Sequence, residues 1–490
     1  MSRLIVGPFN RVEGDLEVHL DIADGVVKSA QVNSTMYRGF EQILLNKPAL
    51  DALIYVPRIC GICSVSQSVA ASRALADAMG VTPPHNGFLV TNLMLATENL
   101  ADHLTHFYLF FMPDFARDHY VGRAWHAVVQ ERFAAQQGQH ARLALAARQR
   151  WFTLLGTLGG KWPHTQSVLP GGSSRAIEAA ERIRLLGRIR EFRAFLEQTL
   201  FAAPLEAIAA IDSEAELQAW HAAAASDDGD LRLFLTLAWQ TGLDAMGPGP
   251  GLYMANGSYP GANGDTLFAR GLWDATGAAG SAALHTLDPA TITEDATHTW
   301  LSDAGGARHP AVGMTLPDID KPAAYTWNKA PRLAGRVLET GALARQVVDG
   351  HPLIRDAVQR CGGTVYTRVL ARLLELALVV PAMENWLKAL RPDEPYFVPA
   401  TLPDDAVGIG LTEAARGSLG HWVAIRNGKL ANYQIVAPTS WNFSPRDAGG
   451  VPGALESALV GAAAPAGEDT PVAVQHIVRS FDPCMVCTVH

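Results

Sequence analysis

The spacing of apolar residues predicts a chain built mainly from long helices. Between residues 87 and 110 the apolar positions recur every three or four residues, as in a helix with one buried face. These positions are Leu89, Leu93, Ala96, Leu100, Leu104 and Phe107. Similar spacing predicts helix at residues 38–55, 64–79, 116–155, 174–211, 214–225 and 365–391. The longest of these segments are expected to pack into a central bundle.

The first 35 residues alternate between apolar and polar side chains, which predicts strands. The alternation is clearest from Leu16 to Ile22, and Asp24-Gly25 provides a turn before Val26. Glycine, proline and short strand-like runs dominate residues 245–335, and the last hundred residues mix strands with loops. No internal repeat or flexible linker is visible. We therefore expect one domain, residues 1–490, of the α+β class, predominantly helical with small β-sheets at its periphery.

Composition excludes several classes of protein. Hydrophobic residues make up 48% and charged residues 18% of the chain, which indicates a folded protein with a large core. The net charge of −9, without basic runs, gives no reason to expect a nucleic acid as partner. No secretory signal is visible, and the apolar run from Leu373 to Met383 is far shorter than the ~20 residues that span a bilayer. We expect no membrane span.

Four of the five cysteines form two CxxC pairs, Cys60 with Cys63 and Cys484 with Cys487. Zinc ribbons place such pairs about 15–20 residues apart, whereas 421 residues separate Cys63 from Cys484. A folded domain must therefore bring the pairs together. Four thiolates suit zinc, an iron–sulfur cluster, copper or nickel, so a structural zinc site remains an alternative at this point.

So few cysteines do not suggest the disulfide framework of a secreted protein, and we expect a reducing, cytoplasmic location. The fifth cysteine, Cys361, is expected to be a buried, inert thiol at the start of a helix.

Further motifs lie between the cysteine pairs. They are Arg11-Val12-Glu13-Gly14, Tyr37-Arg38-Gly39-Phe40-Glu41, His106-Phe107-Tyr108, Tyr325-Thr326-Trp327-Asn328-Lys329-Ala330-Pro331-Arg332, Glu413-Ala414-Ala415-Arg416-Gly417 and Pro438-Thr439-Ser440-Trp441-Asn442. Together with Arg58-Ile59-Cys60-Gly61-Ile62-Cys63 and the stretch from Asp482 to His490, this ordered set resembles the large subunit of nickel–iron hydrogenases over nearly the whole chain. The resemblance implies the fold of that subunit and the cleavage of H2.

The resemblance also implies roles for the cysteines. Cys60 and Cys484 would bind nickel terminally, while Cys63 and Cys487 would bridge it to an iron in a Ni-Fe(CN)2CO centre. Splitting H2 needs a base beside the metal to accept the proton. In the family this acceptor corresponds to Cys484, and Glu13 corresponds to the next proton relay.

Other family positions surround this centre. Arg416, Asp114, Asp482 and Pro483 correspond to the residues over the open metal position, although Arg416 could simply neutralise the two aspartates. Thr439 corresponds to the hydroxyl that hydrogen-bonds an iron cyanide, with Pro438 beside it. A further group corresponds to the family's site for Mg2+ or another divalent cation, with the ligands Glu41, His490 and the backbone carbonyl of Ile435.

The cysteine count also predicts a partner. Once four cysteines bind the metals, only Cys361 remains, which is too few to hold an iron–sulfur cluster. The resemblance therefore implies a small subunit that carries the iron–sulfur clusters, and it is compatible with a dimer of heterodimers.

Three features depart from most catalytic members and resemble the regulatory, hydrogen-sensing branch. Gln67 stands where a histidine is usual; it can donate a hydrogen bond to a bridging sulfur but cannot become a cation. Ile62 and Phe110 replace smaller gas-channel residues, and the sequence ends at His490 without the cleaved extension of catalytic members. We therefore expect a hydrogen sensor that signals to a histidine kinase. The alternatives are an energy-conserving uptake hydrogenase and a non-catalytic relative with a structural metal.

Overall fold

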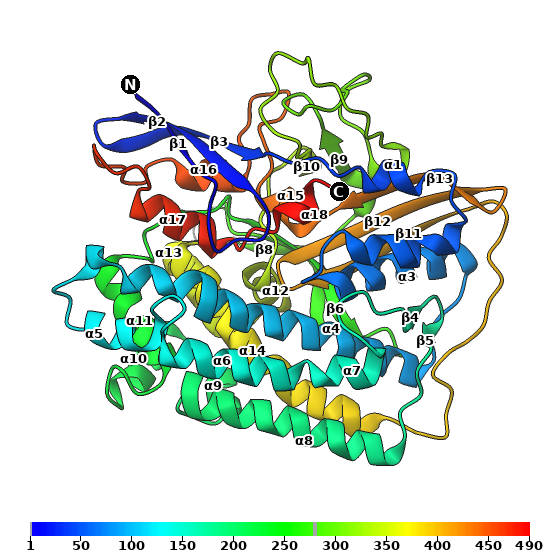
Figure 1. Ribbon diagram of the computed structural model, residues 1–490, viewed down its shortest axis with the longest axis horizontal. Coiled ribbons are helices and arrows are strands. Elements are labelled where there is room, and N and C mark those ends of the chain that lie inside the picture. Colours follow the sequence, from blue (N-terminus) through cyan, green and yellow to red (C-terminus); the bar gives the residue numbers. More distant parts are fainter. Residues whose placement is uncertain (1, 278–281) are drawn as a thin grey trace.

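The centre of the molecule is a group of long helices (Figure 1), in a computed structural model that describes residues 2–277 and 282–490. α4 (His85–Thr105) packs against α14 (Val365–Ala389), and both contact a second layer made of α6 (Gln139–Trp151) and α8 (Ala179–Phe195). Most residues of α4 and α14 are buried, as expected for helices enclosed by other elements. The predicted central bundle is confirmed.

Shorter helices surround this bundle. They are α1 (Phe40–Leu44), α2 (Ala52–Tyr55), α3 (Ser64–Met79), α5 (His126–Phe133), α7 (Thr153–Gly159), α9 (Leu205–Ala209), α10 (Glu214–Ala222), α11 (Asp230–Thr241), α12 (Ala342–Asp349), α13 (Pro352–Cys361), α15 (Pro438–Asn442), α16 (Ala454–Leu459), α17 (Val472–Ser480) and α18 (Met485–Thr488). Short 3-10 segments are η1 (Ala49–Asp51), η2 (Val56–Arg58), η4 (Met112–Ala116), η5 (Asp118–Tyr120), η7 (Pro289–Thr291) and η8 (Pro310–Val312). Two π-helical segments, η3 (His106–Phe111) and η6 (Leu196–Leu200), continue α4 and α8.

The helix predicted at residues 64–79 is found with the same bounds, as α3. The predicted segments 38–55, 116–155 and 174–211 are each interrupted. A residue with positive φ stands in each of them, at Asn46 (63°), Gln136 (65°) and Ala202 (49°). Such a backbone conformation cannot continue a right-handed helix.

Strands in the described residues form small antiparallel sheets around the bundle. Their members are β1 (Ser2–Val6), β2 (Leu16–Ala23) and β3 (Val26–Ser34); β4 (Val168–Leu169) and β5 (Gly172–Ser173); β6 (Leu252–Pro260), β7 (Thr266–Asp274) and β8 (Ala283–His285); β9 (Ile292–Asp295) and β10 (Ala330–Leu333); β11 (Ala406–Ala414), β12 (Gly417–Arg426) and β13 (Lys429–Val436). The predicted N-terminal strands are confirmed, with Leu16 opposite Ser34 and with Asp24 and Gly25 in the turn.

The sheet of β11, β12 and β13 packs directly on α3. Gly408 and Gly410 make this possible, because a Cβ atom at either position would overlap the carbonyl oxygen of Ala74 or Ala70. The close contact fixes the turn between β11 and β12, which carries Arg416, beside the helix that follows Cys63.

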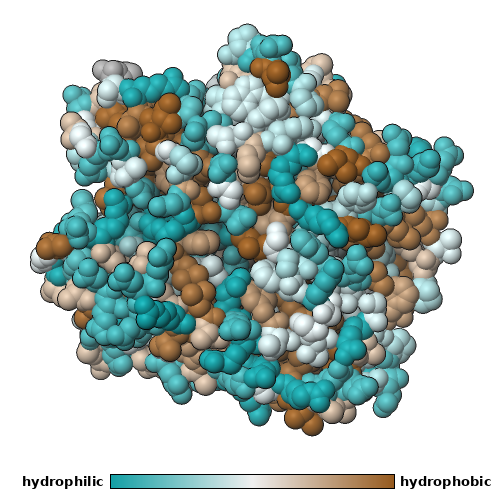
Figure 2. Space-filling model, viewed as in Figure 1, coloured by the Kyte–Doolittle hydropathy of each residue, from teal (hydrophilic) through white to brown (hydrophobic). Residues whose placement is uncertain are grey.

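Segments near the two ends of the chain pack against each other. β3 contacts α16, and the C-terminus lies beside α15 and α18 (Figure 1). The sequence did not predict α16 and α17 within the last hundred residues. No helix in the described part of the chain combines the length and the apolarity needed to cross a bilayer. Figure 2 shows apolar residues in small groups among hydrophilic ones over one face.

Candidate metal centre

The two CxxC pairs meet at one point, although they come from opposite ends of the chain. Cys60 follows η2, Cys63 immediately precedes α3, and Cys484 immediately precedes α18, which contains Cys487. The sulfur atoms of Cys60 and Cys484 are 3.5 Å apart, those of Cys63 and Cys487 are 3.1 Å apart, and those of Cys484 and Cys487 are 2.9 Å apart. All four lie within 4.8 Å of one another. Among the described residues, this is the one His, Cys, Asp or Glu group found with the geometry of a metal site.

The surroundings of the sulfurs disfavour four free thiolates. All four cysteines are buried, and burial raises the pKa of the Cys484 and Cys487 thiols. Four neighbouring thiolates would repel one another, so a metal cation is needed to hold them deprotonated. A donor set made only of sulfur suits nickel, iron or zinc and does not suit magnesium or calcium.

Glu13 is attached to the C-terminal cysteine loop through its backbone. Its N–H donates to the carbonyl of Pro483 at 3.4 Å, and its carbonyl accepts from the N–H of Met485 at 2.7 Å. Gly14 allows this contact, because it has φ of 80° and a Cβ there would lie 3.0 Å from the nitrogen of Val486. Burial, followed by the nearby Cys60, raises the pKa of the Glu13 carboxyl.

Arg416 joins two buried carboxylates. Its Nη2 donates to Asp102 at 3.2 Å and to Asp482 at 3.1 Å, and its Nε donates to the carbonyl of Asp482 at 3.0 Å. A second bond joins Nη1 to Asp102. Burial raises the pKa of Asp102 to about 7, with Asp482 and Cys60 adding to the effect and Arg416 opposing it.

The sequence prediction that grouped Asp114 with Arg416 is corrected by these contacts. Asp114 lies in η4, where Arg11 and Arg479 donate to its two oxygens. Asp102, which the sequence analysis did not select, is the second carboxylate on Arg416. It lies twelve residues earlier, on α4.

Gln67 has a different partner from the one predicted. Its Oε1 lies 2.9 Å from Nε2 of His421, and the other ring nitrogen of His421 lies 2.7 Å from the hydroxyl of Tyr433. A bond from Gln67 to a bridging sulfur is not among the hydrogen bonds of the described residues. Gln67 nevertheless stands one helical turn after Cys63, and its N–H donates to the carbonyl of that cysteine.

Glu98 was also missed by sequence reasoning. Its carboxylate accepts from the backbone N–H groups of Val65 at 2.8 Å and Ser66 at 2.9 Å, and from the indole of Trp162 at 3.0 Å. The hydroxyls of Ser64 and Ser66 donate to it as well. Glu98 therefore caps the first turn of α3, directly after Cys63. The sequence offered two signals for this role of Glu98. Two serines stand next to a CxxC pair, and Glu98 stands four residues before Asp102.

Thr439 and the two predicted prolines lie against the Cys484 loop. The hydroxyl oxygen of Thr439 accepts from the N–H of Cys484 at 3.1 Å, so its own hydrogen is free to donate elsewhere. Pro438 is the first residue of α15, and the carbonyl of Pro483 accepts from Glu13.

The residues predicted to bind a divalent cation lie near one another at the C-terminus. Nε2 of His490 lies 3.3 Å from Oε1 of Glu41, and the N–H of Ile435 donates to the same oxygen at 2.8 Å. The ammonium of Lys329 lies 3.5 Å from Glu41 and 3.3 Å from Glu294. Glu41, Glu294, Lys329 and His490 line a cavity of about 10 Å³, which leaves room for one small ion or water, and Ile435 is not part of its wall.

Three other predicted residues have simpler surroundings. Ile62 packs against the apolar cluster that contains the four cysteines. Phe110 is half-buried in η3, and its carbonyl accepts from Arg11 at 3.0 Å. Cys361 is half-buried at the end of α13, not at a helix start as predicted, and its thiol donates to the carbonyl of Ala357 at 3.2 Å.

Comparison with known proteins agrees with this geometry. The family model described as nickel-dependent hydrogenase matches residues 38–137 and 233–490. The periplasmic [NiFeSe] hydrogenase large subunit of Desulfomicrobium baculatum is 30% identical, over 100% of this chain and 95% of that protein. The hydrogenase-2 large chain of Escherichia coli K12 is 26% identical, over 100% and 97% of the two chains.

Solved structures agree as well. The Ni-Fe-Se hydrogenase of D. vulgaris Hildenborough in the reduced state superposes with a TM-score of 0.85 at 28% identity, and each chain is covered over 100% of its length. The expected hydrogenase large-subunit fold is therefore confirmed. The match extends through both cysteine pairs and through the helices that separate them, and the chain belongs to the nickel-dependent hydrogenase family.

Proposed function

We propose that this chain is the large subunit of a nickel–iron hydrogenase that binds and heterolytically cleaves H2 and works as a hydrogen sensor. The observation that carries the first part is the approach of four buried sulfurs from opposite ends of the chain to within 4.8 Å. Cys60 and Cys484 would hold the nickel, and Cys63 and Cys487 would hold both the nickel and the iron. When bound, a Ni-Fe(CN)2CO centre polarises H2 and takes up its electrons.

The protein side chains manage the proton. Cys484 is the proposed first acceptor, and Glu13 is the next, because its backbone is bonded on both sides of Cys484. The raised pKa of Glu13 lets this carboxyl exchange a proton nearer to neutral pH than an exposed glutamate does. Arg416 holds Asp102 and Asp482 in place beside the centre, and its charge offsets theirs.

The Cys484 loop also shapes the proposed iron site. The hydroxyl hydrogen of Thr439 is free to donate to a cyanide, because its oxygen already accepts from Cys484. Pro438 and Pro483 restrict the backbone on the two sides of this contact.

We further propose a divalent cation, Mg2+ in the first instance, between Glu41, His490 and the carbonyl of Ile435. Carboxylate and carbonyl oxygens suit such a cation, and the small cavity there admits a single ion. Metal analysis should find one magnesium per chain, and Glu41→Gln should abolish it.

A small subunit with iron–sulfur clusters is the proposed partner, because the four cysteines of the metal centre leave only Cys361. We treat residues 1–490 as one domain, since a single apolar cluster includes residues from Val6 to Met485. We also propose a cytoplasmic location, although the D. baculatum relative is named periplasmic.

The sensing role, with a histidine kinase as receiver, rests on Gln67, Ile62 and Phe110. Gln67 keeps one charge state at all pH values, unlike histidine, and His421 holds its side chain. An uptake hydrogenase is the second candidate, because a relative from Rubrivivax gelatinosus, 27% identical, is named an uptake hydrogenase large subunit.

Two measurements test the proposal. Infrared spectra of nickel-containing protein should show bands of metal-bound carbonyl and cyanide, and their absence would remove the hydrogenase function. Dye reduction under H2, per nickel, should be slower than the typical enzyme rate of about 10 per second. A rate above about 100 per second would favour the uptake enzyme.

A further inference from the structure

A second cavity lies away from the cysteine centre, between the N-terminal segment and α17. Its volume is about 400 Å³. Its polar lining consists of Asn10, Arg11, Arg117, Thr470, Gln475 and Arg479. No acidic residue is among the described residues that line it. Glu468 and Asp469 precede Thr470 in the sequence but are not part of the wall.

Positive charge exceeds negative charge around this cavity. Asp114, which is fully buried, is the nearby carboxylate, and it accepts from both Arg11 and Arg479. Arg117 lies 4.0 Å from the same carboxylate. Three guanidinium groups therefore share one carboxylate. His476, 3.9 Å from Asp114, adds no charge, because burial lowers its pKa to about 4.

The hydrogen-bonding capacity of these arginines is not used up. Nε of Arg479 and Nη1 of Arg117 are buried, and neither has a hydrogen-bond partner within the described residues. The side chain of Arg479 is only 1% exposed. Burial lowers its pKa to about 10, and repulsion by Arg11 and Arg117 contributes. Unsatisfied buried donors are unfavourable, and they leave positive charge poorly compensated beside the cavity. Both atoms are closed to solvent, so an anion in the cavity would contact the more exposed side chains of Arg11 and Arg117.

The start of α17 adds a further set of donors. Thr470, which precedes this nine-residue helix, and Gln475, in its first turn, both line the cavity, so the helix begins beside it. No side chain caps that turn. The free N–H groups of a helix N-terminus attract anions. Arg479, whose Nε has no hydrogen-bond partner within the described residues, lies on the same helix.

We propose that this cavity binds a doubly charged oxyanion, namely phosphate, either free or as the phosphate group of a small metabolite. Arg11 and Arg117 supply the charge and the forked donors that phosphate prefers, and the buried Arg479 adds its charge behind them. The occupied site would relieve the repulsion among the three arginines. It would also stabilise α17, which leads through Asp482 directly to Cys484.

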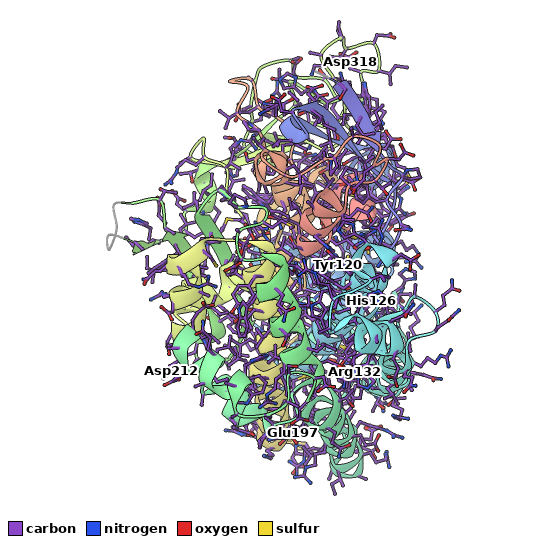
Figure 3. All side chains as sticks on the ribbon, turned by 90° about the vertical axis from the view of Figure 1, so that its left-hand side faces the viewer. Tyr120, His126, Arg132, Glu197, Asp212 and Asp318 are labelled. Carbon is purple, nitrogen blue, oxygen red and sulfur yellow. The ribbon has the colours of Figure 1, made fainter. Side chains whose placement is uncertain are left out.

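The surroundings of the cavity are consistent with a fixed site. His476 stacks on Phe115 at 4.4 Å between ring centroids, and its Nε2 lies 2.6 Å from the hydroxyl of Tyr120. Figure 3 shows Tyr120 at the junction of the α5 region with α17. This aromatic packing holds α17 against the segment that carries Asp114 and Arg117.

Calorimetric titration of the metal-loaded protein with inorganic phosphate at low ionic strength tests the proposal. We expect saturable binding of one phosphate per chain, weakened at least tenfold in Arg117→Ala. Arg117 is the variant of choice because it is partly exposed and holds Asp114 only loosely. Arg123→Ala is the matched control, since Arg123 is exposed in the same region and does not line the cavity.

A parallel titration with glucose 6-phosphate identifies the form of the ligand. Tighter binding of the sugar phosphate indicates a metabolite, and tighter binding of inorganic phosphate indicates the free ion. Failure of both to bind saturably, or equal weakening by Arg117→Ala and Arg123→Ala, would refute the proposed site. Circular dichroism of both variants shows whether the fold is retained.

Discussion

The amide oxygen of Gln67 lies 2.9 Å from Nε2 of His421, and this contact links the helix after Cys63 to the sheet beneath it. His421 also contacts the hydroxyl of Tyr433 at 2.7 Å, and all three residues are buried. Burial lowers the pKa of His421 to about 3, so its ring is neutral and donates through only one nitrogen. If Tyr433 donates to Nδ1, then Nε2 must donate to Gln67, which fixes the direction of its amide.

Tyr433→Phe should disturb this chain without leaving a cavity. His421 would lose the partner of Nδ1, and an unsatisfied buried polar group costs about 1–3 kcal/mol of unfolding free energy. Urea denaturation measures the loss, and infrared bands of the loaded centre should shift because Gln67 is no longer held in one orientation. Tyr55→Phe is the control, since Tyr55 is only half-buried. Equal stability in both variants would show that Tyr433 does not support His421.

Substitution by asparagine should lower the activity at Asp102 and the stability at Asp114. Asp102→Asn keeps the shape of a residue that contacts Arg416 beside the sulfurs, so we expect nickel content to be retained and H2 oxidation to fall by at least tenfold. Asp114→Asn leaves Arg11 and Arg479 without their carboxylate, and breaking a buried ion pair costs about 3–5 kcal/mol. It should therefore reduce the yield of folded protein. Nickel analysis, dye reduction and thermal denaturation of the two variants distinguish these outcomes; full activity in Asp102→Asn would refute its role.

The sequence pointed to Asp114 as the partner of Arg416, whereas the structure places Asp102 there. This error shows where prediction from sequence was limited. Asp102 belongs to the helix predicted at residues 87–110, whereas Asp114 lies between that helix and the next predicted one, so which of them faces Arg416 depends on how the chain continues after the helix. The π-helical segment η3 lies between them and shifts the helical phase by widening the turn. The apolar spacing carries no sign of such a segment. A regular 3.6-residue repeat therefore cannot locate the side chains beyond His106.

Local motifs were more reliable than long-range partners. Each CxxC pair and the strands before Ser34 are set by neighbouring residues, so the sequence identified them. Glu98 and His421 could not be found in this way, because they act on α3 from segments 32 and 354 residues away from their partners. The interruptions at Asn46, Gln136 and Ala202 were also hidden, since these residues adopt positive φ without being glycine.

The buried carboxyl of Glu456 should make the free energy of unfolding depend on pH. It is buried between β3 and α16, where it accepts from the N–H of Val32 at 3.0 Å and from the hydroxyl of Tyr325 at 2.7 Å. Burial raises its pKa to about 7, whereas the unfolded value is about 4.3. The folded state therefore holds an extra proton between these values. Its stabilising contribution is complete below about pH 4 and is lost as the pH rises through 7, by about 4 kcal/mol.

Glu456→Gln should remove this dependence. Urea denaturation at pH 5 and pH 8 gives the difference in unfolding free energy for each protein, and the variant should show a smaller decrease than the wild type. Comparing the two differences cancels the contribution of other titrating groups. Glu131→Gln, at an exposed position, should behave as the wild type. An equal decrease in the wild type and Glu456→Gln would show that Glu456 titrates normally.

Glu98 should matter more for the metal centre than its distance in sequence suggests. Its carboxylate accepts from two backbone N–H groups at the start of α3, from the hydroxyls of Ser64 and Ser66, and from Trp162. Every one of these partners is a donor. Glu98→Gln would turn an amide NH2 towards some of them, and the unmatched donors should lower the unfolding free energy by about 1–3 kcal/mol. Because α3 begins directly after Cys63, the same change should loosen that ligand and lower the nickel content per chain.

Glu178→Gln is the matched control for this effect, since Glu178 is the exposed N-cap residue of α8 and lies far from the cysteines in sequence. Exposed caps contribute about 1 kcal/mol or less, and α8 carries no metal ligand, so nickel content should be unchanged. If Glu98→Gln loses nickel and Glu178→Gln does not, the carboxylate of Glu98 supports the metal site by holding the start of α3. Equal nickel content in the two variants, with lower stability in Glu98→Gln, would restrict Glu98 to holding α3 and Trp162 together.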